Sequence, residues 1–431
     1  MNLLRPGQVV STERSHIACN VVSLIRGGGQ GEVYLATMEG RPVAIKWYYP
    51  DYLPSDPNLR ERLRRAAGAG APGPRFLWPL EIAVAEGVPS FGYVMPVRDP
   101  HLVEAAEVFG ADDPPSLRLT ARYGFELANN FRHLHARGFC YADINDRNVF
   151  VDPATGDVAI CDNDNVDVNG TPSAILGTPR FRAPEVALGH AFPSATSDLH
   201  SLAVMLFVAL VRHHPFDGAA VTAATLDAAA VREHFERRPI FIFDPDDDSN
   251  RPLPRHVNPL AIWPLLPGEV RRLFIRAFTE GLRDPSNGRV TEGEWRGAML
   301  RLHDSFYNCE RCGAENFFDF ESSSNPCFNC RNVPERVLRI CIDRETVVLN
   351  GDTTISAHHV DAHARYDLAQ IVGAVEPHPT LANVWGLKNL GRHAWHAQRD
   401  GTRTEIAPGR SVRIVPGTQI DFGSRVGAIQ Q

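Results

Sequence analysis

Four short motifs occur in a fixed order within the first 185 residues, and this order constrains the fold more strongly than any other feature of the sequence. They are the glycine-rich RGGGQGEVY with the VAIK that follows it (26–46), YADINDRN (141–148), DND (162–164) and GTPRFRAPE (177–185). A hairpin turn or an Asx turn explains any one of them taken alone. Chance turns do not explain all four in this order, so we interpret them as parts of one folded domain.

The local patterns around these motifs change from strands to helices near residue 100. β-branched and aromatic runs predict short strands up to about residue 50 and again over 77–84 and 91–97. A short helix is expected over 57–67, with Asp56 as its cap and Pro57 in its first turn. Apolar spacing then predicts longer helices, over 117–135, 201–212, 267–282 and 292–302. Residues 335–431 are rich in β-branched residues and glycine turns, which predicts a separate all-β domain.

The composition is that of a globular protein, with 43% hydrophobic and 22% charged residues. The net charge of −7 provides no basic field, which argues against nucleic acid or an anionic membrane as a partner. The longest apolar run, Leu202–Val211, is too short to cross a bilayer, and the first residues lack the regions of a signal peptide. Together with the sparse cysteines, this indicates a cytoplasmic protein.

Lysine is exceptionally scarce in this chain. Of its 44 basic residues only Lys46 and Lys388 are lysines, and the other 42 are arginines. A lysine that persists against such a bias indicates a position where a planar guanidinium cannot replace a compact ammonium.

The motifs carry groups suited to binding a nucleotide and magnesium. A glycine-rich turn lets backbone N–H groups approach phosphate oxygens, and Lys46 on the next predicted strand could hold the α- and β-phosphates of ATP. Asp143 and Asn148 have the spacing of a catalytic-loop base and a magnesium-binding amide. Asp162 follows a short apolar strand, where it could ligate magnesium.

Four of the eight cysteines have the spacing C-x2-C-x14-C-x2-C: Cys309, Cys312, Cys327 and Cys330. Two such thiolate pairs predict a tetrahedral structural zinc site, in which the metal replaces the core that so short a segment cannot build. A pair of disulfides is the alternative, and a reducing cytoplasm disfavours it. We expect Cys19, Cys140, Cys161 and Cys341 to be buried apolar residues.

Residues 1 to about 305 resemble a eukaryotic-type protein kinase domain. The resemblance implies that Lys46 holds the phosphates and that Glu61, the only carboxylate between Asp56 and Glu81, is its partner. Asp143 would orient or deprotonate the acceptor hydroxyl, while Asn148 and Asp162 would hold magnesium. The phosphate-covering loop and the adenine contacts would come from Gly28, Gly29, Gly31, Val33, Met95 and Val97, the last two in a hinge over 95–98.

The resemblance also implies two structural contacts and shows several departures. Glu185 would pair with Arg289, and Asp198 would anchor the catalytic loop. The usual His-Arg before the catalytic Asp is Tyr141-Ala142, so we expect no switch based on phosphorylation of the activation segment. Asn145 stands where serine/threonine kinases carry a lysine, the DFG motif reads Asp-Asn-Asp, and Arg26 replaces the first glycine of the loop. Thr178 of the GTP match favours serine/threonine acceptors.

The tail resembles a forkhead-associated (FHA) domain through SAHH at 356–359, WGLKNLG at 385–391 and PGTQIDFG at 416–423. Two interpretations stay open: phosphothreonine binding through Ser356, or a purely structural or docking sandwich. The kinase, zinc ribbon and FHA-like tail together are similar to bacterial kinases of the tellurium-resistance-associated type. That resemblance implies a von Willebrand A-domain protein and a metal-dependent protein phosphatase as partners, beside a protein substrate.

The expected fold class is α+β: a bilobal protein-kinase fold followed by a zinc ribbon and an all-β sandwich. The expected domains are a kinase N-lobe (1–98), a C-lobe (99–305), the zinc ribbon (306–334) and the FHA-like sandwich (335–431). The expected function is that of an ATP- and magnesium-dependent protein kinase with a structural zinc. The alternatives are a pseudokinase scaffold, motivated by Tyr141, Ala142 and Asn145, and a kinase-fold enzyme that phosphorylates a small molecule.

Overall fold

The computed structural model describes residues 3–222, 227–335, 337–381 and 384–431. The chain forms two compact units. The first holds residues 1–115, 119–263 and 271–297, and the second holds 116–118, 264–270 and 298–431. Within the described ranges, no helix is both long enough and apolar enough to cross a membrane.

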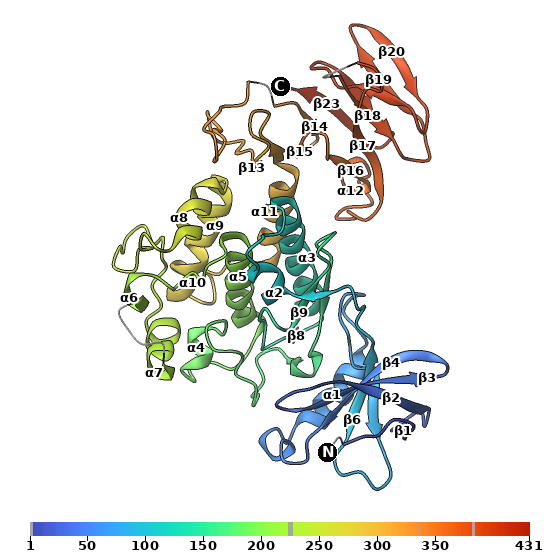
Figure 1. Ribbon diagram of the computed structural model, residues 1–431, viewed down its shortest axis with the longest axis vertical. Helices are drawn as coiled ribbons and strands as arrows, with labels where there is room; N and C mark the ends of the chain where they lie inside the picture. Colours follow the sequence, from blue (N-terminus) through green and yellow to red (C-terminus); the bar gives the residue numbers. More distant parts are fainter. Residues whose placement is uncertain (1–2, 223–226, 336, 382–383) are drawn as a thin grey trace. The chain divides into compact units, whose positions relative to one another are not determined.

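The first unit begins with a closed six-stranded barrel in the order β1-β2-β3-β4-β6-β5, all of its pairs antiparallel (Figure 1). Its strands are β1 (Val9–Thr12), β2 (Ala18–Gly27), β3 (Gly31–Met38), β4 (Arg41–Tyr48), β5 (Glu81–Val84) and β6 (Gly92–Pro96). The predicted strands are therefore confirmed, although the strands predicted over 77–84 and 91–97 are shorter in the structure. Alternate residues of β3 fill the apolar interior, with Tyr34 and Ala36 fully buried.

Helix α1 (Leu59–Ala69) lies between β4 and β5 in the chain. It begins two residues later than predicted, after Asn58, and Asp56 does not cap it. The carboxylate of Asp56 instead accepts hydrogen bonds from both terminal nitrogens of Arg62, at 3.0 and 2.6 Å. Because that side chain is already engaged by a buried guanidinium, it is not available to the helix N-terminus.

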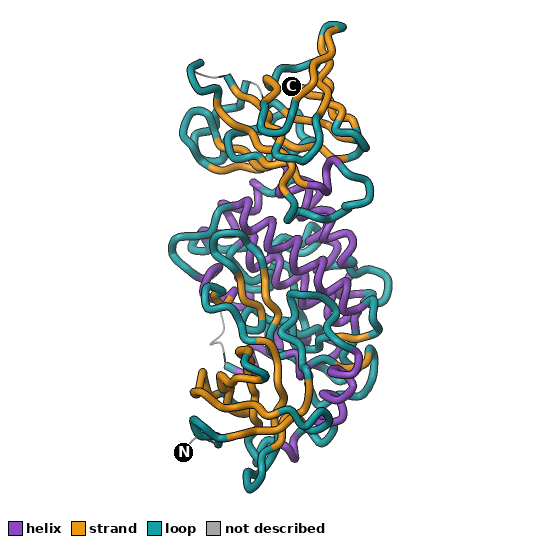
Figure 2. Tube along the Cα trace, turned by 90° about the vertical axis from the view of Figure 1, so that its right-hand side faces the viewer, coloured by secondary structure: helices purple, strands orange, loops and turns teal. Residues whose placement is uncertain are grey.

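Helices dominate the rest of the first unit (Figures 1 and 2). They are α2 (Ala105–Gly110), α3 (Leu117–His135), α4 (Pro184–Ala187), α5 (Ala195–Val211), α6 (Ala219–Thr222), α7 (Ala228–Val231), α8 (Val257–Ile262), α9 (Gly268–Phe278), α10 (Glu280–Arg283) and α11 (Glu292–Asp304). The first residues of α3 and α9 and the end of α11 belong to the second unit. The bounds of α3 are as predicted. Helix α5 starts six residues before the predicted 201, because Ser194 and Ser197 form a capping box there. The single helix expected over 267–282 is two helices that meet at Thr279.

Short strands flank the loops between some of these helices. They form a three-stranded sheet in the order β10-β9-β7 and a two-stranded sheet of β11 and β8. Their bounds are β7 (Val103–Glu104), β8 (Phe139–Cys140), β9 (Val149–Val151), β10 (Val158–Ile160) and β11 (Asp167–Val168). The motif at 141–148 therefore connects β8 to β9, and the motif at 162–164 follows β10, where a strand end was expected.

The second unit is mostly strand and loop (Figure 2). A hairpin of β12 (Phe306–Asn308) and β13 (Glu315–Phe317) precedes a six-stranded sheet, β15-β14-β23-β22-β19-β20, and a four-stranded sheet, β16-β17-β18-β21. Their bounds are β14 (Arg339–Ile342), β15 (Glu345–Val348), β16 (Thr354–Ser356), β17 (Ile371–Pro377), β18 (Trp385–Asn389), β19 (Trp395–Arg399), β20 (Thr402–Ile406), β21 (Ser411–Arg413), β22 (Gln419–Asp421) and β23 (Val426–Gln430), with the short α12 (Ala357–Val360) after β16. One apolar cluster includes Ile340 and Ile429 of the first sheet and Val375 and Leu387 of the second. The β-rich character of the tail is confirmed, and its assignment as an FHA-like sandwich stays a prediction.

Candidate active site and metal site

Lys46 occupies the middle of a buried polar cluster. It lies on β4 opposite Val33 of β3, and its side chain is only 7% exposed. The ammonium Nζ is 2.8 Å from Oε1 of Gln30, 2.8 Å from Oδ2 of Asp164 and 3.6 Å from Oδ1 of Asp162. Burial lowers the pKa of Lys46, but the carboxylates of Asp164 and Asp162 outweigh it and raise the pKa above its ordinary value. The amine is therefore held as a charged ammonium.

Asp164 is the acid in closest contact with Lys46, and its side chain is 2% exposed. Its Oδ2 also accepts a hydrogen bond from the hydroxyl of Tyr48 at 2.5 Å. Burial raises the pKa of Asp164, but the neighbouring Lys46 ammonium and these hydrogen bonds bring it below its ordinary value. The sequence reasoning did not single out Asp164, Gln30 or Tyr48, although the scarcity of lysine pointed to the place where they meet.

The expected ion pair between Glu61 and Lys46 is not present. The Glu61 side chain is 67% exposed and lies 3.8 Å from Arg64, one helical turn further along α1. Arg62, the next residue, is the one that faces inward: it is buried, it binds Asp56, and its Nε donates to the backbone carbonyl of Asp164 at 2.8 Å. The contact of α1 with the cluster around Lys46 is therefore made by Arg62 and not by Glu61.

Asp143 and Asn148 lie together in the loop between β8 and β9. The amide nitrogen of Asn148 donates to Oδ2 of Asp143 at 3.1 Å, and the hydroxyl of Thr178 donates to Oδ1 at 2.7 Å. Asn145 supports this contact, because its amide donates to the Thr178 hydroxyl at 3.0 Å. Burial raises the pKa of Asp143 above its ordinary value, against the opposing effect of these hydrogen bonds. A serine or threonine hydroxyl thus already occupies one oxygen of this carboxylate.

Asp162 stands at the exposed edge of the cluster. Its backbone is left-handed, with φ at 46°, and its side chain is 40% exposed. Asn148 is tied to the same strand end, since the N–H of Cys161 donates to its carbonyl at 2.9 Å. Because the Asn148 amide nitrogen is engaged with Asp143, its side-chain oxygen is the atom left to bind a ligand. A carboxylate and an amide oxygen fit the preference of magnesium for oxygen ligands.

The candidate catalytic loop is anchored from helix α5, as expected. Oδ2 of Asp198 accepts the N–H of Tyr141 at 2.5 Å, and Oδ1 accepts the N–H of Ala142 at 3.0 Å. His135 lies 3.0 Å from Asp198 and contacts Glu292 through its other ring nitrogen. Burial lowers the pKa of His135, but these two acids outweigh it and raise the pKa to about 9. The anchor is therefore a charged imidazolium between two carboxylates.

Two further expectations can be compared with the structure. The ion pair of Glu185 with Arg289 is confirmed, at 2.8 Å. Ala142, which replaces the usual arginine, has a left-handed backbone with φ at 67° and carries no group that could meet a phosphate. The hydroxyl of Tyr141 donates to the carbonyl of Cys161, so it links the catalytic loop to the segment that carries Asp162.

The three glycines of the candidate phosphate loop differ in what requires them. A Cβ on Gly31 would lie 2.1 Å from the carbonyl of Trp47, so packing against β4 alone demands glycine there. A Cβ on Gly29 would meet no described atom within 4 Å, and one on Gly28 only the Gly31 carbonyl at 3.8 Å. Gly28 and Gly29 therefore leave space above their backbone, as a phosphate-covering loop needs.

The expected adenine contacts lie in a second apolar cluster, which the barrel shares with helix α1. Met95 and Ala44 are buried in one apolar cluster, and Val33 and Val97 pack against it while remaining partly exposed. Ala44, which sequence reasoning passed over, pairs with Met95 across β4 and β6. Arg26, at the first position of the glycine-rich loop, pairs with Glu104 at 2.9 Å. Ala44 lies two residues before Lys46 on β4, so the two side chains share one face of the sheet.

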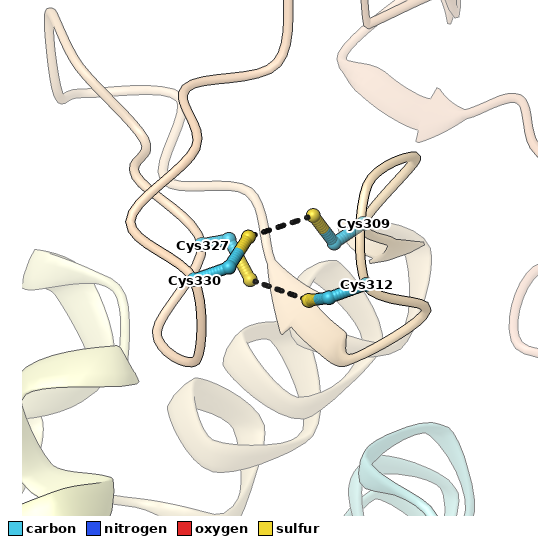
Figure 3. Close-up of side chains that lie close together, drawn as sticks. All are labelled: Cys309, Cys312, Cys327 and Cys330. Atoms are coloured by element: carbon cyan, nitrogen blue, oxygen red, sulfur yellow. Dashed lines mark hydrogen bonds between the residues drawn. The ribbon is translucent and has the colours of Figure 1, made fainter.

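The four predicted zinc ligands converge in the second unit (Figure 3). Their sulfur atoms all lie within 4.8 Å of one another, and the pairs Cys309–Cys330 and Cys312–Cys327 are 3.6 Å apart. Four sulfurs about 2.3 Å from one zinc ion are separated by roughly 3.8 Å, whereas a disulfide requires about 2.05 Å. The spacing of these sulfurs therefore fits zinc and does not fit disulfides.

The two Cys-x-x-Cys segments have the same backbone turn. The N–H of Gly313 donates to the carbonyl of Cys309, and the N–H of Arg331 donates to the carbonyl of Cys327, at 2.8 and 2.9 Å. Both of these donor residues are left-handed, with φ at 72° and 59°. The second segment forms the turn without glycine, which indicates that the ligand geometry imposes the turn.

The remaining sequence-selected residues are placed as follows. Cys19 and Cys140 are buried as expected, whereas Cys161 and Cys341 are partly exposed. Ser356 is only 3% exposed, and its hydroxyl lies 3.0 Å from Nδ1 of His359. Such a serine does not present its hydroxyl to a phosphopeptide.

Comparison with known proteins agrees with this geometry. Residues 108–262 match the family model described as "Protein kinase domain". That stretch contains Asp143, Asn148 and Asp162, whereas Lys46 lies before it. The similarity to a protein kinase domain thus covers residues 108–262 of this chain.

Curated relatives point to one class of kinase. The chain is 28% identical over 218 residues to the serine/threonine-protein kinase pkn2 of Myxococcus xanthus, which is 46% of this chain and 25% of that protein. It is 28% identical over 213 residues to the probable serine/threonine-protein kinase PknB of Corynebacterium glutamicum, 46% of this chain and 32% of that protein. It is 31% identical over 204 residues to the serine/threonine-protein kinase PknK of Mycobacterium tuberculosis, which is 46% of this chain and 18% of that protein. The chain thus spans no more than a third of each of these relatives.

Proposed function

We propose that this protein is an ATP- and magnesium-dependent protein kinase that transfers the γ-phosphate to serine or threonine hydroxyls. The observation that carries the proposal is the convergence of Lys46, Asp162, Asn148 and Asp143 on one edge of a buried cluster. The charged ammonium of Lys46 lies 3.6 Å from Asp162. The backbone carbonyl of Asn148 accepts the N–H of Cys161, next to Asp162, and its side-chain amide donates to Asp143. These residues supply the kinds of group that phosphoryl transfer by a kinase uses.

Each residue has a defined part in the proposed reaction. Bound magnesium would neutralise charge on the transferring phosphoryl group, with Asn148 and Asp162 as its protein ligands. Lys46 would hold phosphate oxygens as a fixed cation beneath the backbone of Gly28 and Gly29. Asp143 would orient the acceptor hydroxyl; in the structure its Oδ1 accepts the hydroxyl of Thr178. Catalysis would rest on positioning and charge, with no covalent enzyme intermediate.

The pseudokinase alternative is less well supported. Tyr141, Ala142 and Asn145 motivated it, but two of these side chains have structural roles in the loop: the Tyr141 hydroxyl donates to the carbonyl of Cys161, and the Asn145 amide donates to the Thr178 hydroxyl. The APE match with its Glu185–Arg289 pair favours a protein substrate over a small molecule, because it belongs to the peptide-docking part of protein kinases.

We also propose the four-part organisation of the chain: lobes over 1–98 and 99–305, a zinc ribbon over 306–334 and an FHA-like β-sandwich over 335–431. The tail would act as a docking domain rather than a phosphothreonine reader, since Ser356 is buried. A von Willebrand A-domain protein and a metal-dependent phosphatase are the partners we propose for it, in the cytoplasm. The support for these two partners is the resemblance of the whole arrangement to the tellurium-resistance-associated kinases.

The test of the proposed activity is incubation of the purified full chain with γ-labelled ATP and magnesium, beside the Asp143→Ala variant. Label on the wild type that is lost in Asp143→Ala supports a kinase, and mapping of the labelled residues decides serine or threonine against tyrosine. Nucleotide binding without any transfer in the presence of candidate protein substrates would instead support the scaffold. Elemental analysis should find about one zinc ion per chain, and none in a Cys309→Ser/Cys327→Ser variant.

A further inference from the structure

The acid that holds the Lys46 ammonium is on a different element from the one the kinase resemblance implies. We propose that Asp164 is the positioning residue for Lys46 and that helix α1 contributes a cation, Arg62, in place of a carboxylate. This inference rests on the proposed function, because positioning Lys46 matters only if Lys46 binds phosphate.

Distance and burial support Asp164 over Glu61. Oδ2 of Asp164 is 2.8 Å from Nζ of Lys46, and both side chains are almost completely buried. Glu61 is an exposed residue whose nearest cation is Arg64. Gln30, from the turn after β2, completes the contacts of the ammonium at 2.8 Å. The lysine is thus fixed on one side by the glycine-rich loop and on the other by the segment that follows Asp162.

The buried charges also balance without a carboxylate from α1. Lys46 and Arg62 are the buried cations, and Asp164 and Asp56 are the buried anions that pair with them; Asp162, 3.6 Å from Lys46, is 40% exposed. Asp164 binds Lys46 through its carboxylate and Arg62 through its backbone carbonyl, at 2.8 Å in both cases. A further buried acid here would have no cation of its own, and an uncompensated buried charge is strongly destabilising. This arrangement explains how an arginine is accommodated among the buried residues of α1.

The arrangement has a consequence for the reaction. Asp164 follows Asp162 by two residues, within the short turn over 163–165. The candidate magnesium ligand and the candidate phosphate-binding cation are therefore set by one turn of backbone. Movement of α1 could therefore reach Lys46 through Arg62 and that turn, without an ion pair between Glu61 and Lys46.

The scarcity of lysine makes a direct experiment possible. Protein labelled with ¹³C,¹⁵N-lysine should give side-chain signals from only two residues, Lys46 and Lys388, and Lys388→Arg assigns them. We expect Asp164→Asn to shift the Lys46 ε-carbon and Nζ signals and to speed exchange of its ammonium protons with water. Glu61→Gln should leave both signals in place. Tyr48→Phe, which removes the hydroxyl bound to the same carboxylate but keeps the ion pair, should move the Lys46 signals less than Asp164→Asn.

Kinetics provide the second readout. Asp164→Asn should lower kcat/KM by about 100-fold, whereas Glu61→Gln should stay within about two-fold of wild type. Asp164→Glu, which keeps the carboxylate, should recover part of the loss in kcat.

The outcomes separate this inference from the proposed function. If the wild type transfers no phosphate, the proposed activity fails, and the lysine spectra still decide which acid holds Lys46. A Lys46 signal that moves in Glu61→Gln, or one that stays fixed in a folded Asp164→Asn, overturns the inference. Since Glu61 is exposed, its variant folds whatever happens to Asp164→Asn, and it can overturn the inference by itself.

Discussion

Two buried networks in this molecule are built from the same kinds of groups but differ at their edges. In the first unit, the network of Lys46, Asp164 and Arg62 ends at Asp162, whose side chain is 40% exposed. In the second unit, Nε2 of His359 lies 3.1 Å from Asp304, and the other ring nitrogen accepts the backbone N–H of Ser356. The members of this second network, the hydroxyl of Ser356 included, are buried.

The difference shows that a buried, paired charge does not by itself mark a reactive site. Both networks satisfy their charges internally, as buried ions must. The pKa of His359 is raised, even though burial opposes it, because Asp304 faces its ring, much as Asp164 raises the pKa of Lys46. Only the first network places a charged group where a ligand can reach it. The second links Asp304 at the end of α11 to the turn after β16, which is a structural role.

The largest effect is expected from the replacement of Lys46, with the replacement of Lys388 as the comparison. Lys46→Arg should lower phosphoryl transfer by about 1,000-fold, because a planar guanidinium does not fit where Gln30 and Asp164 each approach to 2.8 Å. Lys388→Arg is the matched control: Lys388 is partly exposed and pairs with Glu376 at 3.0 Å, so activity should stay within about two-fold. Radiolabel transfer measures both. Equal losses in the two variants would contradict the distinction between the sites.

The network of the second unit can be tested through stability. Asp304→Asn leaves the His359 imidazole buried beside a neutral amide and should destabilise the β-rich part by about 3 kcal/mol. Hydrogen–deuterium exchange of β14 to β23 in the full chain would measure this without interference from the first unit. Unchanged exchange protection would show that the His359 network does not support the fold.

Ser356→Ala distinguishes a structural network from a phosphothreonine site. Loss of the hydroxyl should cost about 1 kcal/mol, because His359 keeps the bond from the Ser356 N–H at 3.0 Å. Titration with a phosphothreonine peptide should give the same weak or absent binding in the wild type and the variant. A peptide affinity that depends on Ser356 would mean that this segment opens and that the comparison of the two networks is wrong.

The anchor of the catalytic loop should be sensitive to alkaline pH. His135 faces Asp198 of α5 and Glu292 of α11, and its pKa of about 9 lies above the ordinary value near 6.5. A raised pKa means that the stabilisation is complete below about pH 6.5 and is lost as the pH rises through about 9, with a total of roughly 3 kcal/mol. Thermal unfolding of wild type and His135→Gln between pH 6 and 10 measures it. The two curves should converge at high pH, and parallel curves would contradict the assignment.

What could be predicted from the sequence follows from how local each feature is. The order of motifs and the apolar spacing of α3 depend on neighbouring residues, and Lys46 stood out through its rarity alone. The partner of Lys46 depends on which side of α1 faces the barrel. The position of one carboxylate, Glu61, in the sequence does not determine that side. The scarcity of lysine was also an imperfect guide, because Lys388 is equally rare and lies in a partly exposed pair with Glu376. The sequence predicts Asp56 as a helix cap from its position before Pro57. Its pairing with Arg62 depends on how the folded helix places that arginine.

The smallest effect is expected in the activation segment. The hydroxyl of Thr171 donates to the carbonyl of Val168 at 2.8 Å, the hydroxyl of Ser173 accepts the N–H of Ile175 at 3.1 Å, and Ala142 provides no cation for a phosphate on either. Thr171→Ala and Ser173→Ala should therefore keep activity within about two-fold of wild type. Thr178→Ala, a nearby substitution that removes the hydroxyl bound to Asp143, should instead lower kcat by about ten-fold. A ten-fold loss in either of the first two variants would show that a modified activation segment, and not the preformed loop, sets the position of Asp143.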